Sequence, residues 1–240
     1  MADSSIPAPF ALPAERPAGF RGEWMVDESR RSAFAEHSGI LRALPAAVAV
    51  PDDADDVAAL VRWAAKHRVP LVPRSAGTGM PGGNVGPGVA VDLRTAFEAV
   101  GWVDAERRLA RVLPGATLHR LNDAAAEDGL HFPVDPSSGA RATLGGIIAN
   151  NSAGSHTVRY GAARRWIESL DVVLADGTAL TTTRGQRVSI SARFASMTAS
   201  TRSRMARSRG CSSRAPRVVV SAVPSARTTS RDSIHRRAAP

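Results

Sequence analysis

Glycine and proline make up half of the segment PRSAGTGMPGGN, from Pro73 to Asn84, and a helix is implausible in such a segment. Gly77, Gly79 and Gly82 have the G-x-G-x-x-G spacing of a nicotinamide-type turn, which requires a helix directly after it. Prolines and further glycines follow instead, and the next regular element is the strand VAVDL. The segment is therefore predicted to be a strand-loop-strand unit whose bare amides form a nest for an anion, with a flexible surface loop as the alternative.

The neighbouring elements are predicted from ordinary capping and turn signals. Asp52 to Asp56 mark a solvated helix start, apolar residues follow at helical spacing, and Pro70 ends that helix. Thr117 caps a second helix, TLHRLNDAAAEDG, and Asp176-Gly177 marks a hairpin. Further strands are expected at 71–72, 88–93, 100–104 and 109–113, the last two forming another hairpin.

A second glycine-rich segment runs from Val134 to Gly154 and contains TLGGIIANNSAG. Its asparagines and serine can hydrogen-bond the edges of a heterocycle or the oxygens of a phosphate. In the first segment, Arg74, Ser75 and Thr78 can add charge and hydroxyl donors to phosphate oxygens. Two such segments, separated by a helix and a hairpin, indicate a large ligand held from two sides, and a flavin dinucleotide meets that requirement.

Four motifs in this order resemble a known family: PRSAGTGMPGG, PGATLHRLN, VDPSSGARATLGGIIANNSAGSHTVRYG and LDVVLADGT. The chain resembles the FAD-linked oxidases, with their vanillyl-alcohol oxidase or PCMH-type FAD-binding domain, and is most similar to the glycolate oxidase subunit, D-lactate and D-2-hydroxyglutarate dehydrogenase branch. The resemblance implies an α+β fold of two lobes with FAD between their loops. It covers about residues 38–183, and the domain is expected to be incomplete at its C-terminal end.

The resemblance also implies the cofactor-binding residues. Those expected to hold the FAD pyrophosphate are Arg74, Ser75, Ala76, Gly77, Thr78, Gly79, Gly82 and Gly83. Those expected along the flavin and phosphate path are Pro136, Ser137, Ser138, Thr143, Leu144, Gly145, Gly146, Asn150, Asn151, Gly154 and Tyr160. Some family members tether the flavin through a histidine in the first loop, and this loop has none, so noncovalent FAD is expected.

The activity implied by the resemblance is oxidation of a small 2-hydroxy acid by hydride transfer to flavin N5. Electrons would pass to a quinone or an iron-sulfur partner. The family's substrate domain is not visible in the sequence, so no catalytic residue is assigned and activity of this chain alone is left open. One alternative is a same-fold flavin reductase that uses NADPH.

The chain has a net charge of +9, but its basic residues are unevenly distributed. Of the 31 basic and 22 acidic residues, 12 arginines and one aspartate follow Arg184, so 19 basic and 21 acidic residues lie in 1–184. The Arg- and Ser-rich tail has no sustained helical or strand periodicity. We expect a lead-in at 1–37, the FAD-binding domain at 38–184, and a tail at 185–240 that is disordered or derived from a frameshift. The alternative is a non-catalytic fragment with a basic arm for nucleic acid.

Other sites and targeting signals are not expected. The histidines His37, His67, His119, His131 and His156 lack metal-ligand spacing, and a structural or surface role is predicted for each. With Cys211 as the single cysteine, the chain holds no internal disulfide and no thiolate-bound cluster of its own. Without a secretory signal or a long apolar run, a cytoplasmic location and no transmembrane segment are expected.

Overall fold

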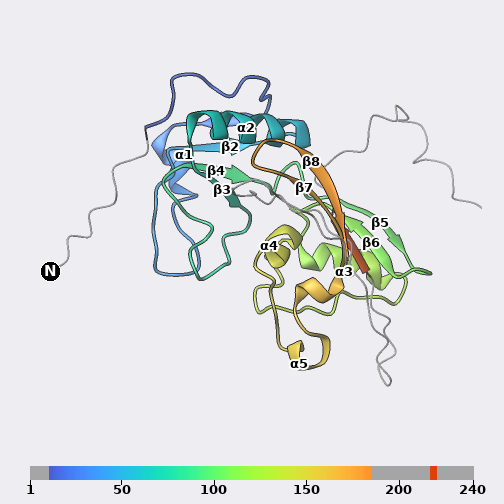
Figure 1. Cartoon of the computed structure of the whole chain (residues 1–240). Coiled ribbons are helices and arrows are strands. Elements are labelled where there is room, and N and C mark those ends of the chain that lie inside the picture. Colours follow the sequence, from blue (N-terminus) through green and yellow to red (C-terminus); the bar gives the residue numbers. More distant parts are fainter. Residues whose placement is uncertain (1–10, 185–216, 221–240) are drawn as a thin grey trace, which may run out of the picture.

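The structure is a computed structural model that describes residues 11–184 and 217–220 (Figure 1). Two sheets organise it, and we call the parts built on them the first and the second lobe. Sheets and helices are mixed in both lobes, which confirms the predicted α+β class. Within the described residues, every helix is too short or too polar to cross a bilayer.

The first lobe contains a four-stranded sheet in the order β1-β2-β4-β3. Strand β1 (Glu23–Met25) is antiparallel to β2 (Ala47–Val50), whereas β2, β4 (Val89–Asp92) and β3 (Leu71–Arg74) are parallel. Helix α1 (Glu28–Ser32) lies between β1 and β2 in the chain, and α2 (Ala54–His67) covers one face of the sheet (Figure 1). The strands at 71–72 and 88–93 are confirmed with small changes at their ends.

The side chains of β2 alternate between the two faces of the first sheet, as the two-residue period of a strand requires. Ala47 and Ala49 pack with Leu60 of α2, whereas Val48 points to the opposite face and packs with Phe34. Both faces of this sheet are therefore covered by apolar residues, as is usual for parallel strands, and the loops at the ends of its strands start from a packed core.

Asp56 connects the segment just before β1 to the start of α2. Its carboxylate accepts hydrogen bonds from the backbone N–H groups of Arg21, Gly22 and Asp52, at 3.0, 2.9 and 3.0 Å. Burial alone would raise the pKa of the Asp56 carboxyl, but these donors outweigh burial and hold the pKa below its ordinary value. The helix start is confirmed, with Asp53 as N-cap, but the prediction that all its carboxylates are solvated is wrong for Asp56, which is fully buried.

The second lobe contains a five-stranded sheet in the order β5-β6-β9-β7-β8. Its strands are β5 (Val100–Asp104), β6 (Leu109–Val112), β7 (Ile167–Val173), β8 (Ala179–Thr183) and β9 (Arg217–Val220). Both predicted hairpins, β5-β6 and β7-β8, are confirmed as antiparallel pairs. Its helices are α3 (Leu118–Ala126), α4 (Leu144–Ala149), α5 (Thr157–Tyr160) and the 3₁₀ turn η1 (Ala163–Trp166).

The core of the second lobe lies between this sheet and helices α3 and α4. Leu121 of α3, Leu144 and Ile147 of α4 and Trp166 of η1 pack together there. Strand β7 belongs to both lobes, since Leu170 packs against this core and Val173 packs into the core beneath α2. The lobes are thus joined by a shared strand (Figure 1).

Strand β9 corrects one expectation about the chain after Arg184. Residues 217–220 form a strand that pairs in parallel with both β6 and β7. The prediction that regular structure is lacking beyond Arg184 is therefore wrong at these four residues. For residues 185–216 and 221–240, as for 1–10, the predictions lie outside the part that the structure describes.

Candidate functional site

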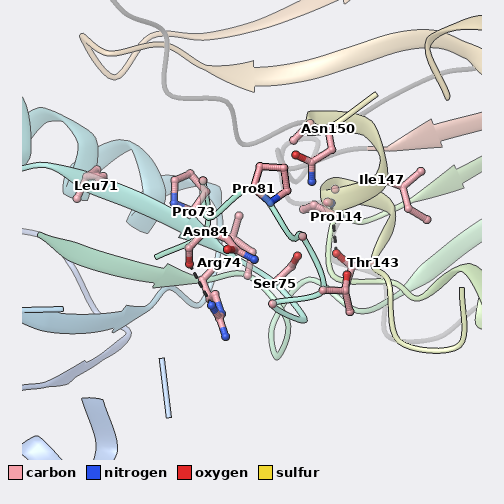
Figure 2. Close-up of a pocket in the computed structure, with 18 of the residues that line it drawn as sticks. Leu71, Pro73, Arg74, Ser75, Pro81, Asn84, Pro114, Thr143, Ile147 and Asn150 are labelled. Atoms are coloured by element: carbon pink, nitrogen blue, oxygen red, sulfur yellow. Dashed lines mark hydrogen bonds between the residues drawn. The ribbon is translucent and has the colours of Figure 1, made fainter. Parts of the chain in front are cut away.

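A cavity of about 1110 Å³ lies between the lobes. Ligand pockets usually enclose roughly 300–1,000 Å³, so this cavity suits a ligand larger than a typical small metabolite. The end of α2, strand β3 and the loop after it form one wall, and Pro114 and α4 form the other (Figure 2). The cavity therefore lies where both glycine-rich segments were expected to meet a ligand.

The loop from Ser75 to Asn84, which we call the cradle loop, begins at the carboxyl end of β3. Strands β3 and β4 are parallel, so the chain must return to the start of β4, and it does so without a helix. This confirms the predicted strand-loop-strand unit and excludes a nicotinamide-type turn. Ligands of open parallel sheets bind at the carboxyl ends of the strands, where the cradle loop begins.

The segment from Glu36 to Ser38 fixes the carbonyl groups of the cradle loop. The Ser38 N–H donates to the Gly77 carbonyl at 3.1 Å, and His37 Nδ1 lies 2.9 Å from the Gly79 carbonyl. By contrast, the backbone N–H groups of residues 75–79 donate to no acceptor in the described part of the chain. An anion nest requires such a run of unbonded amides, and all of these residues except Ala76 line the cavity.

The Arg74 side chain bonds the end of the cradle loop to the segment around Glu36. Its guanidinium donates to the Glu36 carbonyl at 2.7 Å and to the Asn84 carbonyl at 3.0 Å. Figure 2 shows it extending away from the α4 side. Burial chiefly lowers the Arg74 pKa, and the nearby Arg94 lowers it further. Arg74 lines the cavity, but its charged group, which was expected to donate to phosphate, is bonded to carbonyls of the protein.

Gly77 and Gly79 of the cradle loop differ in whether their backbone and surroundings could accept a side chain. Gly77 has φ +72°, and a Cβ there would lie 2.8 Å from Cζ of Arg74. Gly79 has room for a Cβ, which would lie 3.5 Å from Nδ2 of Asn84 and 3.6 Å from Nδ2 of Asn150. Gly77 is therefore required by the fold, whereas Gly79 keeps space open on the cavity side of the loop.

Helix α4 brings the second glycine-rich segment against the cradle loop. A Cβ on Gly146 would lie 2.9 Å from Ser75 Oγ, and one on Gly145 would lie 2.7 Å from Cβ of Pro114. The first amides of α4 are already bonded: Leu144 N–H to the Ala116 carbonyl, Gly145 N–H to the Pro114 carbonyl, and Gly146 N–H to Oγ1 of the N-cap Thr143. Helix α4 therefore closes a wall, and the free anion donors belong to the cradle loop.

The structure brings eleven of the nineteen predicted site residues to the cavity wall. They are Arg74, Ser75, Gly77, Thr78, Gly79, Gly83, Ser138, Thr143, Gly145, Gly146 and Asn150. The other eight are not among its lining residues: Ala76, Gly82, Pro136, Ser137, Leu144, Asn151, Gly154 and Tyr160.

Several of the eight have evident structural roles. Leu144 is buried in the second core, Asn151 Oδ1 accepts a hydrogen bond from the Arg164 N–H at 3.0 Å, and Gly154 packs against the backbone of Asp135. The Tyr160 ring packs edge-on against Trp166, 6.0 Å between centroids. These residues therefore stabilise the second glycine-rich segment and the turns after it, which adjoin the cavity wall formed by α4.

Other lining residues were not predicted. Val61 and Ala64 of α2, Arg68 at the C-cap of that helix, Pro114 and Asn84 lie on the wall. In the sequence, the α2 residues are indistinguishable from the other core positions of an amphipathic helix, and only the packing of the lobes exposes them to the cavity. Asn84 ends the glycine-rich segment itself, so its position there is the one signal that pointed to it. His37 was expected to have a structural or surface role. Its Nδ1 atom contacts the Gly79 carbonyl, so the residue holds part of the cradle loop.

The fold and the cavity define a two-lobed module whose cradle loop lies beside a cavity large enough for a dinucleotide. The FAD-binding domain family matches residues 45–183, more than half of the chain. The chain belongs to this family of FAD-binding domains, which confirms the resemblance and the expected cofactor.

Comparison with curated proteins gives relatives among enzymes of 2-hydroxy acids. D-2-hydroxyglutarate dehydrogenase of Pseudomonas putida is 35% identical over 175 residues, which are 72% of this chain and 17% of the relative. D-lactate dehydrogenase of Archaeoglobus fulgidus is 38% identical over 54% of this chain and 29% of its own length. Glycolate oxidase subunit GlcD of Bacillus subtilis is 35% identical over 59% of this chain and 30% of its own. The chain thus spans less than a third of these relatives.

Comparison with solved structures supports the two-lobed fold. 6-Hydroxy-D-nicotine oxidase from Arthrobacter nicotinovorans matches with a TM-score of 0.61 and 26% identity, over 73% of this chain and 38% of that chain. Alkyldihydroxyacetonephosphate synthase matches with a TM-score of 0.60 and 23% identity, over 68% of this chain and 35% of that chain. The PCMH-type architecture expected from the motifs is confirmed.

Proposed function

We propose that this chain binds FAD noncovalently, with the pyrophosphate on the amides of residues 75–79. The observation that carries the proposal is the row of unbonded N–H groups beside the cavity, each a donor that an anion would satisfy. Gly77 and Gly79 permit close approach of the pyrophosphate, and Ser75 and Thr78 add hydroxyl donors. The described lining residues include no histidine, cysteine or tyrosine, which supports noncovalent attachment.

The proposed activity of the intact protein is the oxidation of a small 2-hydroxy acid. The names of the relatives support this class of substrate. When bound, FAD would supply the acceptor for a hydride from the carbon that bears the hydroxyl group, while a base of the intact protein would take the hydroxyl proton. This chain's contribution is placement, because the cradle loop fixes the pyrophosphate while α4 closes the opposite wall. Electrons then pass to a quinone or iron-sulfur partner.

The binding proposal is tested by titrating the flavin-free chain with FAD and following flavin fluorescence. ADP carries the same pyrophosphate, so it should compete with FAD, whereas adenosine should not. The Gly79→Val variant should lose FAD binding, because its side chain occupies the space between Asn84 and Asn150. A purified chain that has no flavin absorbance and no response to added FAD would contradict the proposal.

The substrate proposal has a separate test. The FAD-loaded intact protein is mixed without oxygen with D-lactate, glycolate or D-2-hydroxyglutarate, and the visible flavin absorbance is recorded. Bleaching by one of these acids, with none by its 2-deoxy analogue, is expected. If all three acids leave the absorbance of the intact protein unchanged, the assigned substrate class is wrong, while the FAD proposal stands on its own titration of this chain.

A further inference from the structure

The Asn84 side chain has no hydrogen-bond partner in the described part of the protein, although its Oδ1 atom is buried. Its backbone carbonyl accepts from Arg74, which fixes the residue at the end of the cradle loop. Buried side-chain amides are almost always hydrogen-bonded in folded proteins, because an unpaired buried polar group is costly. Asn84 also lines the cavity, so a bound ligand is available to supply the missing partners.

The position of Asn84 restricts which part of a ligand it meets. Its Nδ2 atom lies 3.5 Å from the point where a Cβ on Gly79 would stand, and Nδ2 of Asn150 lies 3.6 Å from the same point. The two asparagines come from different elements (Figure 2): Asn84 is the last residue of the cradle loop, and Asn150 lies at the end of α4. Asn84 therefore adjoins the amides assigned to the pyrophosphate.

In a dinucleotide, the groups bonded to the pyrophosphate are sugars or polyols. A hydroxyl group both donates and accepts hydrogen bonds, and a side-chain amide also does both. The match holds whichever way the amide is turned. We propose that Asn84 binds a hydroxyl of the ribityl or ribose unit next to the pyrophosphate of FAD. This inference rests on the proposed binding of FAD and adds a residue that hydrogen-bonds the sugar or polyol next to the pyrophosphate.

The test compares the Asn84→Leu variant with the wild-type chain. Leucine has a similar volume and no polar group, so FAD affinity should fall about tenfold or more. The thermal stability of the flavin-free chain should stay the same or rise, because no hydrogen bond within the protein is lost. A purely structural asparagine would behave in the opposite way.

Asn122 provides the matched control. Its Oδ1 accepts from the Phe132 N–H at 2.8 Å, and it does not line the cavity. The Asn122→Leu variant should lose stability in the flavin-free chain, while its folded fraction keeps the FAD affinity of the wild type.

Two partial ligands identify the sugar. FMN contains the ribityl chain and one phosphate, whereas ADP contains the ribose and the pyrophosphate. A loss of affinity for FAD and FMN alone assigns Asn84 to the ribityl chain, and a loss for FAD and ADP alone assigns it to the ribose. Unchanged affinity of Asn84→Leu for all three overturns the inference. Failure of the wild-type chain to bind FAD overturns the proposed function itself, so the two failures are distinguishable.

Discussion

Gly77→Ala and Gly79→Ala place the same methyl group at two positions of the cradle loop, with different expected effects. At Gly77 the backbone is left-handed, which costs a residue with a Cβ about 1–2 kcal/mol. The new methyl also displaces the Arg74 guanidinium, which then loses buried charged hydrogen bonds to two carbonyls, worth about 1.5–3 kcal/mol each. Gly77→Ala should therefore destabilise the chain by about 3 kcal/mol or more.

At Gly79 the methyl group meets only ordinary contacts, at 3.5 and 3.6 Å, and the backbone is not left-handed. The free energy of unfolding should change by less than about 0.5 kcal/mol, as for an unstrained substitution. FAD affinity should fall about tenfold or more, equivalent to about 1.4 kcal/mol, because the methyl group enters the space assigned to the pyrophosphate.

Urea unfolding of the flavin-free variants measures the first effect, and FAD titration of the folded variants measures the second. Gly83→Ala is the control for stability. A Cβ on Gly83 would have nothing within 4 Å, so this substitution should leave the free energy of unfolding unchanged. The reasoning is refuted if Gly77→Ala unfolds within 0.5 kcal/mol of the wild type, or if Gly79→Ala keeps full FAD affinity.

Three further predictions concern stability. Asp56→Ala should lower the free energy of unfolding by about 3–5 kcal/mol in urea, because three backbone N–H groups lose a buried acceptor; a change below 1 kcal/mol would contradict this. Burial, aided by His156, lowers the pKa of His131, so the unfolded chain binds that proton more tightly and stability should decline as pH falls below 6.5. Melting curves of His131→Phe should show a smaller decline, and an identical pH profile would exclude this role. Deleting residues 185–240 removes β9 from between β6 and β7, and the melting temperature should fall; an unchanged value would argue against that pairing.

The local elements were largely predictable because their signals act over a few residues. Thr117 caps α3 by accepting from the Arg120 N–H, and Gly177 takes the left-handed conformation at the turn of the β7-β8 hairpin. Each signal depends on hydrogen bonds or dihedral angles within four residues. The absence of a helix after Gly79 was predictable for the same reason.

The site was only partly predictable because long-range contacts decide what each residue does. Arg74 was expected to donate to phosphate, yet its guanidinium reaches the Glu36 carbonyl, 38 residues away in the chain. Asp56 was expected at a solvated helix start, yet it is buried beneath the backbone of Arg21 and Gly22. No local pattern records such partners.

Local patterns in the sequence were enough to predict most of the elements and the two glycine-rich segments, and four ordered motifs were enough to predict the family and its cofactor. Contacts between distant segments place Ser38 against the Gly77 carbonyl and His37 against the Gly79 carbonyl, while the amides of residues 75–79 donate to no acceptor among the described residues. The physical reason is that glycine permits a loop to take many conformations, and contacts from distant segments select one of them. The same contacts leave the Asn84 side chain at the cavity without a hydrogen-bond partner in the described part of the chain.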